Sequence, residues 1–234
     1  MEIEENLNKL NDSIIAACHR SGRHELAVKL VAVSKTFPTE FVLEAFEAGQ
    51  LVFGESKLQE AEPKIVSLPR SLEWHFIGRV QRNKVRRLLQ NFKVIHAIDS
   101  FKLAAYTAEI ANELGLIPQV FLQINIGGEA SKGGFEISVV RSEMENLLRL
   151  KCLNIIGLMC IPPAATAAES SREWFANLRD LRDDLELEFS IKLPALSMGM
   201  SGDYQVAIEE GATHVRVGSA IFGKRAYRVD GELG

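Results

Sequence analysis

The chain has 234 residues, of which 47% are hydrophobic and 25% are charged, so it can bury a core of the size found in globular domains. Its formal charge of −4 creates no overall basic field, which argues against chain-wide attraction to nucleic acids or acidic membranes. The three cysteines form no C-x-x-C pair and lie near no histidine at ligand spacing, so neither a disulfide framework nor a metal site is indicated. There is no signal sequence, and no apolar run approaches the ~20 residues that span a bilayer, so we expect a cytoplasmic protein without membrane contact.

Hydrophobic residues recur at helical spacing from residue 2 to residue 20, which predicts an N-terminal helix that ends before Gly22. Strands and helices are then expected to alternate. In chain order, the expected elements are a strand at 29–35, a helix at 38–49, a strand at 51–53 broken by Gly54, a helix at 56–66, a strand at 73–77, a helix at 82–91, a strand at 93–98, a helix at 101–114, a strand at 119–126, a helix at 136–150, a strand at 153–161, a helix at 166–187, a strand at 194–198, a helix at 202–211 and a strand at 213–217.

Strands that alternate with helices predict parallel pairing with right-handed crossovers, and eight such units in about 200 residues fit a compact (β/α)8 barrel. The expected fold class is therefore α/β, a single TIM-type barrel with an extra N-terminal helix, formed by residues 1–234 as one domain. A doubly wound open sheet is the alternative. It would normally carry a G-x-G-x-x-G turn after its first strand, where this chain reads V-S-K-T-F-P-T.

Lys35 follows the apolar run Leu30–Val33 at the expected carboxyl end of the first strand. In barrels of this kind the chemistry lies at that end of the strands, and the loops after strands 7 and 8 commonly bind phosphate. Here those loops read M-G-M-S-G-D (198–203) and G-S-A-I-F-G (218–223), with small residues that let backbone N–H groups and the hydroxyls of Ser201 and Ser219 approach an anion. A surface lysine and two ordinary tight turns are the simpler interpretation.

Arg216 shares one face of the last expected strand with His214 and Gly218, because side chains alternate along a strand. The two valines between them suit the layer between sheet and helices, which leaves Arg216 pointing into the barrel. A buried guanidinium needs an acceptor, either an inward carboxylate or a ligand. A ligand with a carbonyl for Lys35, a phosphate for the two turns and an acceptor for Arg216 fits pyridoxal 5′-phosphate (PLP), which has an aldehyde, a phosphate and a ring nitrogen.

Five stretches resemble the pyridoxal phosphate homeostasis protein family, which is related in fold to the barrel domain of alanine racemase. They are VAVSKTFP (31–38), GESKLQE (54–60), HFIGRVQRNK (75–84), GLMCIPP (157–163) and LSMGMSGDYQVAIEEGATHVRVGSAIFG (196–223). The resemblance implies that Lys35 holds PLP as a Schiff base. It places Met200, Ser201, Gly218 and Ser219 around the phosphate and Arg216 opposite the pyridine nitrogen.

Arginine keeps its proton, so the ring nitrogen would stay unprotonated and the cofactor would be a poor electron sink. The family usually has asparagine where this chain has Ser56, which shortens one polar side chain expected near the ring. Arg79 and Arg82 fill variable positions of the family motif and, with Lys84, Arg86 and Arg87, form a basic patch from Arg79 to Arg87. This patch is either a solvated helix face or a surface that steers anionic B6 vitamers or an acidic partner.

The resemblance implies a protein that binds PLP and other B6 vitamers, buffers PLP or delivers it to apo PLP-dependent enzymes, and has no established reaction. The absence of a second domain favours a monomer. A weak one-base amino-acid racemase is the enzymatic alternative, because alanine racemase takes a tyrosine base from a second domain. None of Tyr106, Tyr204 and Tyr227 is an obvious substitute. A cofactor-free lysine aldolase is less expected, since its lysine usually lies on a later strand. A nucleic-acid role for the basic patch is less expected still.

Overall fold

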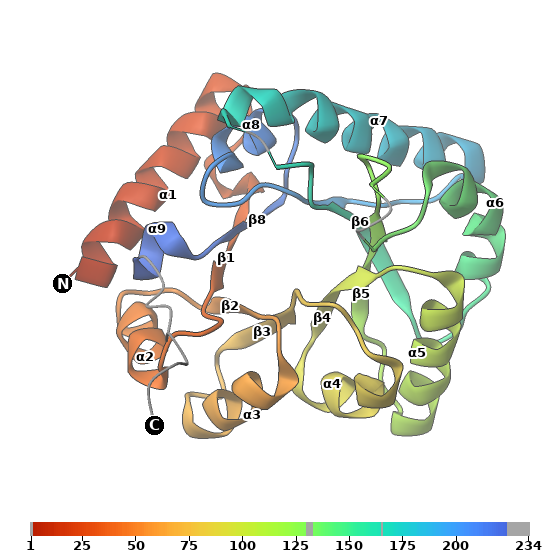
Figure 1. Cartoon of the computed structure of the whole chain (residues 1–234), viewed down its shortest axis with the longest axis horizontal. Coiled ribbons are helices and arrows are strands. Elements are labelled where there is room, and N and C mark those ends of the chain that lie inside the picture. Colours follow the sequence, from red (N-terminus) through yellow and green to blue (C-terminus); the bar gives the residue numbers. More distant parts are fainter. Residues whose placement is uncertain (1, 130–132, 165, 224–234) are drawn as a thin grey trace, which may run out of the picture.

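The computed structural model describes residues 2–129, 133–164 and 166–223. Eight parallel strands close into a barrel in the order β1 to β8, surrounded by helices (Figure 1). The strands are β1 Lys29–Val33, β2 Val52–Glu55, β3 Glu73–Phe76, β4 Val94–Ile98, β5 Gln119–Ile124, β6 Asn154–Cys160, β7 Ala195–Ser197 and β8 His214–Val217. The α-helices are α1 Glu2–Arg20, α2 Thr39–Glu47, α3 Leu58–Ser67, α4 Val85–Asn91, α5 Phe101–Leu114, α6 Ile137–Leu148, α7 Arg172–Phe189, α8 Tyr204–Glu209 and α9 Ser219–Phe222. Short 3-10 turns are η1 Glu25–Ala27, η2 Arg82–Lys84 and η3 Ala168–Ser171.

The first and last strands pair with each other, which closes the barrel. Val31 is in register with Arg216 and Ala32 with Val217, while on the other side of β1 Val33 is in register with Gly54. The residues that follow β1, β2 and β8 therefore meet at one end of the barrel, as the sequence predicts for parallel strands.

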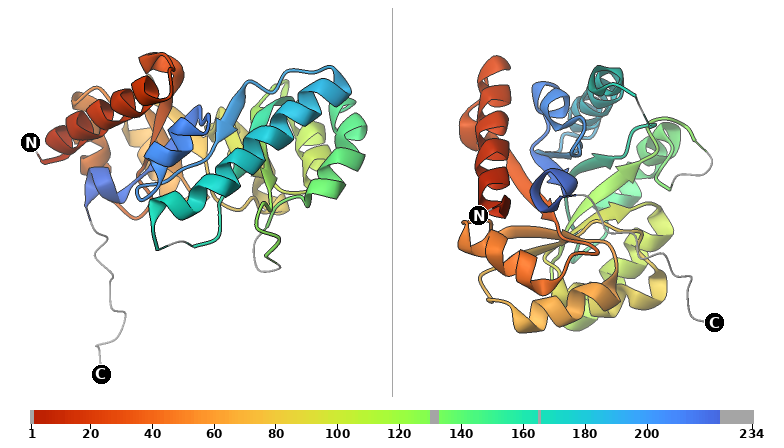
Figure 2. Two further views of the ribbon diagram at one scale, coloured as in Figure 1. Left: turned by 90° about the horizontal axis from the view of Figure 1, so that it is seen from above. Right: turned by 60° about the vertical axis from the view of Figure 1, so that its left-hand side comes forward.

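Helix α1 lies outside the βα alternation, packed against α8 and α9 beside β1 and β8 (Figures 1 and 2). Its buried residues Ile3, Leu7, Leu10 and Ile14 recur at helical spacing, so its inner face is apolar. The expectation of a TIM-type barrel with an extra N-terminal helix is confirmed. Among the described helices, none has the length and apolar composition that a bilayer crossing requires.

Gly54 does not break the second strand, contrary to expectation, because it lies inside β2. A Cβ built on it would come within 2.9 Å of Val31 Cγ1, so a larger residue would displace the neighbouring side chain. The glycine is needed for close packing beside β1 and does not mark a turn. Ser100 caps the N-terminus of α5, since its Oγ accepts a hydrogen bond from the Leu103 N–H at 3.3 Å.

Candidate functional site

Lys35 lies in the turn just past the carboxyl end of β1, and its side chain is half-buried. The next residue, Thr36, has φ 69°, a conformation that few non-glycine residues adopt. Its N–H donates to Glu60 Oε2 at 3.3 Å. Before Lys35, Ser34 is fully buried, and its Oγ donates to Glu55 Oε1 at 2.8 Å. The turn that carries the lysine amine is thus fixed on both sides.

A buried ion pair between Lys64 and Glu55 supports the turn that carries Lys35. Lys64 Nζ, on α3, lies 2.7 Å from Glu55 Oε1 and donates to the Ser34 carbonyl at 2.8 Å. Glu55 is fully buried, and its second carboxylate oxygen has no hydrogen-bond partner among the described residues. This ion pair was not predicted from the sequence. The signal was available, because Lys64 falls at three-residue spacing after Leu58 and Ala61, on the apolar side of its helix.

The turns after β7 and β8 meet each other beside the end of β1. The Gly218 N–H donates to Ser201 Oγ at 3.3 Å, which joins the two turns. A Cβ on Gly218 would lie 3.0 Å from the Val33 carbonyl oxygen, so a side chain there would press against β1. Ser219 is exposed at the start of α9, and Met200 is 38% exposed. The small-residue turns and the segment that carries Lys35 therefore lie at one edge of the barrel.

Arg216 points into the barrel, as its alternation with two valines predicts, and is 5% exposed. Nη1 donates to Ser197 Oγ at 2.5 Å and Nη2 donates to the Cys160 carbonyl at 2.9 Å. These acceptors are a hydroxyl and a carbonyl, and neither is a carboxylate. Burial lowers the pKa of the guanidinium, but arginine starts so high that it stays protonated.

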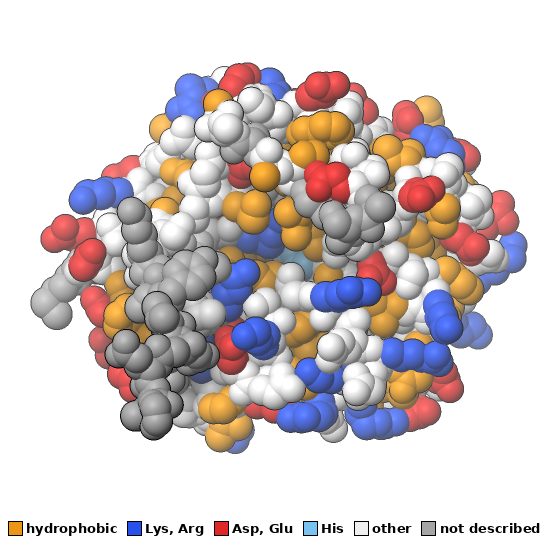
Figure 3. All heavy atoms as spheres, in the orientation of Figure 1, with side chains coloured by type: hydrophobic (Ala, Val, Ile, Leu, Met, Phe, Trp, Pro, Cys, Tyr) orange, Lys and Arg blue, Asp and Glu red, His pale blue; other side chains and the backbone are white. Residues whose placement is uncertain are grey.

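Ser56 follows β2, which neighbours β1, and is half-buried. A Cβ on Gly78, after β3, would come within 2.1 Å of the Ser56 carbonyl oxygen, so the ends of β2 and β3 are closely packed. On the face of the barrel drawn in Figure 3, the centre is hollowed, with basic side chains near its rim and histidine atoms deep inside. A cavity of about 320 Å³ lies between the segment after β6 and the turn after β7, lined by Pro162, Met200 and Asp203 among others.

The tyrosines in the described part of the chain are engaged elsewhere. Tyr204 donates from its hydroxyl to Ser13 Oγ on α1 at 2.9 Å. Tyr106 has the Arg82 guanidinium over its ring, 4.2 Å from the centroid. Tyr227 lies outside the described residues. Neither described tyrosine is placed as a second base.

Only some of the side chains in the basic patch from Arg79 to Arg87 form ion pairs with carboxylates. Arg86 pairs with Glu113 and Arg87 with Glu62. Arg79 and Arg82 are exposed, and no ion pair with a described carboxylate is found for either. Lys84 donates to the amide oxygen of Gln59 at 3.3 Å, so the positive charge that no described carboxylate balances belongs to Arg79, Arg82 and Lys84.

The comparisons with known proteins agree with this geometry. The model of the family described as alanine racemase, N-terminal domain, matches residues 6–226. A pyridoxal phosphate homeostasis protein of Aquifex aeolicus is 43% identical over 224 residues, which cover 95% of this chain and 98% of that protein. The solved structure of PipY from Synechococcus elongatus, with PLP bound, superposes with a TM-score of 0.82 at 37% identity and covers 94% of this chain and 100% of that one.

A more distant solved structure, alanine racemase of Clostridium difficile, has a TM-score of 0.76 at 18% identity and shares the fold. The match covers 98% of this chain and 58% of that enzyme. The chain is thus similar to curated relatives over nearly its whole length and to the larger enzyme over its barrel alone. It belongs to the pyridoxal phosphate homeostasis protein family, within the wider group that shares the alanine racemase N-terminal domain.

Proposed function

We propose that this chain binds PLP at the carboxyl ends of its strands and buffers it or delivers it to apo PLP-dependent enzymes. The observation that carries the proposal is the convergence of three kinds of group at one edge of the barrel. They are the turn that carries Lys35 after β1, the joined turns at Ser201 and Gly218, and the buried guanidinium of Arg216. The family relationship supports the same ligand, because PipY is a solved relative with PLP bound.

The donors present suit the functional groups of PLP. Lys35 can condense with the aldehyde to form a Schiff base with release of water. Ser201, Ser219 and the backbone around Gly218 offer hydroxyl and N–H groups to the phosphate, with Met200 beside them. Arg216 has N–H groups beyond the two that Ser197 and Cys160 accept, and these can donate to the pyridine nitrogen. Ser56 can add one hydrogen bond from the β2 side.

Lys35→Ala is expected to abolish covalent attachment of PLP while leaving the fold intact, because its side chain is half-buried at a turn rather than part of the core. The measurement is the visible absorbance of the protein mixed with PLP, followed by borohydride reduction and peptide mapping. Lys151→Ala is the matched control, since Lys151 is an exposed lysine in the loop between α6 and β6. The assignment of Lys35 would be ruled out if covalent labelling persists in Lys35→Ala, or if other lysines of the wild type are labelled as strongly as Lys35.

Delivery is tested by timing the activation of a defined apo-enzyme by the PLP-loaded protein against free PLP.

We further propose that Arg79 and Arg82 steer the acceptor or the anionic vitamer. Reversing their charge with Arg79→Glu and Arg82→Glu is expected to slow transfer several-fold at low salt, with the difference shrinking at physiological ionic strength. Lys151→Glu is the control for a charge change elsewhere. If both arginine variants transfer PLP like the control, the patch is ordinary solvated surface.

That the chain acts as a monomer in the cytoplasm stays a prediction. Within the described chain none of its three cysteines forms a disulfide, and Cys18 and Cys160 are buried, as expected in a reducing compartment.

A further inference from the structure

A chain of side-chain hydrogen bonds crosses the barrel interior from Arg216 to Glu73. Ser197 Oγ lies 2.5 Å from Arg216 Nη1 and 2.8 Å from His96 Nδ1. His96 Nε2 lies 2.9 Å from His75 Nδ1, and His75 Nε2 lies 2.8 Å from Glu73 Oε1. The three middle members are fully buried. We call these five side chains the Arg216–Glu73 relay.

With both histidines neutral, as their lowered pKa values indicate, the two ends of the relay fix the direction of every bond in it. Arginine can only donate, so Ser197 Oγ accepts from Arg216 and its hydroxyl proton is available to His96 Nδ1. A carboxylate can only accept, so His75 carries its proton on Nε2 and donates it to Glu73. His75 Nδ1 is then an acceptor, and His96 must donate to it from Nε2. Both histidines therefore hold the same tautomer, with the proton on Nε2.

The electrostatics agree with this assignment. Burial lowers the pKa of His96 well below its ordinary value and, despite the neighbouring carboxylate, also lowers that of His75. The hydrogen bond from His75 lowers the pKa of Glu73 to about 2. At neutral pH the relay thus has a cation, Arg216, at one end, an anion, Glu73, at the other end and only neutral groups between them.

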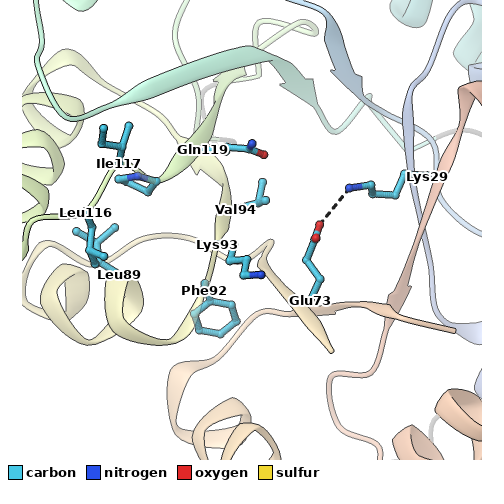
Figure 4. Close-up of a pocket in the computed structure, with 10 residues that line it drawn as sticks. Lys29, Glu73, Leu89, Phe92, Lys93, Val94, Leu116, Ile117 and Gln119 are labelled. Atoms are coloured by element: carbon cyan, nitrogen blue, oxygen red, sulfur yellow. Dashed lines mark hydrogen bonds and ion pairs between the residues drawn. The ribbon is translucent and has the colours of Figure 1, made fainter. Parts of the chain in front are cut away.

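The Glu73 end of the relay lies at the amino-terminal ends of the strands, whereas Lys35 follows the carboxyl end of β1. Glu73 and Lys29, the first residues of β3 and β1, form an ion pair at 3.1 Å and line a cavity of about 370 Å³ together with Lys93 (Figure 4). This cavity contains none of the residues assigned to PLP. A change at Glu73 can therefore reach the PLP side only indirectly, through the relay or through Lys29 on β1.

We propose that Ser197, His96, His75 and Glu73 are positioning residues that hold the Arg216 guanidinium in one place and orientation. The role toward PLP rests on the proposed function. A long arginine side chain loses rotamer freedom when it is fixed, and its buried charge needs acceptors. The relay supplies an acceptor whose lone pair is aimed at Nη1, because the remote carboxylate keeps each donor in the chain pointing away from Arg216. The guanidinium is thereby preorganised before a ligand arrives.

The first test uses the protein without PLP. Nitrogen NMR of the histidine rings is expected to show His75 and His96 neutral, with the proton on Nε2, and proton–nitrogen spectra to show a slowly rotating Arg216 guanidinium. Glu73→Ala removes the terminal acceptor at a partly exposed site, so folding is little at risk. Glu73→Ala is expected to populate both tautomers of His75 and His96 and to speed the rotation of the Arg216 guanidinium. Glu73→Gln keeps an acceptor oxygen and is expected to retain the wild-type pattern. Lys93→Ala, in the same cavity but outside the relay, is the matched control.

The second test measures PLP affinity and the pH dependence of the visible absorbance of the bound form. Glu73→Ala and Ser197→Ala are each expected to raise the dissociation constant about tenfold, while Glu73→Gln and Lys93→Ala stay within about twofold of wild type. Wild-type affinity in both alanine variants, or an Nδ1-protonated His96 in the wild type, would overturn the inference. A wild-type chain that takes up no PLP would instead refute the proposed function, and the guanidinium rotation would still decide whether the relay positions Arg216.

Discussion

Lys64→Met is expected to lower the free energy of unfolding by about 3–5 kcal/mol, because it leaves the fully buried carboxylate of Glu55 without its cation. The ammonium of Lys64 is 2.7 Å from Glu55 Oε1 and also satisfies the Ser34 carbonyl at 2.8 Å. Methionine restores neither contact. Urea denaturation monitored by circular dichroism measures the loss, which is a large part of the stability of an ordinary domain.

Lys57→Met is the matched control for this experiment. Lys57 directly precedes α3 and pairs with Glu60 at 2.8 Å, but its side chain is 65% exposed, so the unfolding midpoint is expected to stay nearly unchanged. The double variant Glu55→Gln, Lys64→Met should recover part of the loss, since neither charge is then buried alone. Equal midpoints for Lys64→Met and Lys57→Met would show that the buried pair contributes no more than a surface pair.

The same pair links stability to the site. Ser34 accepts from Lys64 and donates to Glu55, and it immediately precedes Lys35. The contacts of α3 with the ends of β1 and β2 therefore set where the Lys35 turn begins. A loosened pair would give the amine more freedom, and we expect faster release of PLP from Lys64→Met at temperatures where the variant is still folded.

Most of the fold could be predicted from the sequence because each strand is a short apolar run bounded by glycine, proline or a capped helix. The alternation of His214, Arg216 and Gly218 with two valines was enough to orient Arg216 inward, because the strand period is fixed at two. Gly54 was misread because a glycine that ends a strand and one that allows close packing look alike in sequence. Only the distance to Val31 separates them.

The contacts inside the barrel could not be predicted in the same way. His96 and Ser197 are 101 residues apart on strands that are not neighbours, and they meet because both side chains point into the closed barrel. The sequence places both histidines in strands, yet the stagger of the strands decides which layer each ring occupies. The two turns that approach each other at Ser201 and Gly218 were easier to foresee, since they follow neighbouring strands.

Acid is expected to destabilise the chain steeply below about pH 6.5, because the barrel holds two fully buried histidines and a third, half-buried one without charge. The rings of His75, His96 and His214 lie with centroids 5.1 to 6.0 Å apart. Burial lowers the pKa of His214 to about 3, and it lowers the values of His75 and His96 as well. Lys29 and Arg216 add positive charge nearby, and Glu73 is the one carboxylate bonded to the group within the described chain.

The direction in which the free energy of unfolding changes with pH depends on whether the folded or the unfolded state binds more protons. Between pH 6.5 and the lowered folded values, the unfolded histidines are protonated and the folded ones are not, so the free energy of unfolding falls as the pH falls. Each histidine contributes up to about 1.4 kcal/mol per pH unit, and all three together approach about 4 kcal/mol per pH unit. Glu73 acts in the same direction below pH 4.5, because its folded pKa is about 2.

Urea midpoints measured from pH 7.5 to pH 5 at constant ionic strength isolate the histidines, since few carboxylates titrate in that range. His214→Gln is expected to reduce the slope by about one proton, because glutamine binds none in either state. His19→Gln, at an exposed position near the end of α1, should leave the slope unchanged. A slope equal in His214→Gln and wild type, or a stability that is flat from pH 7 to pH 5, would mean that the barrel admits protonated histidines. The Arg216–Glu73 relay could not then have one fixed direction at mildly acidic pH.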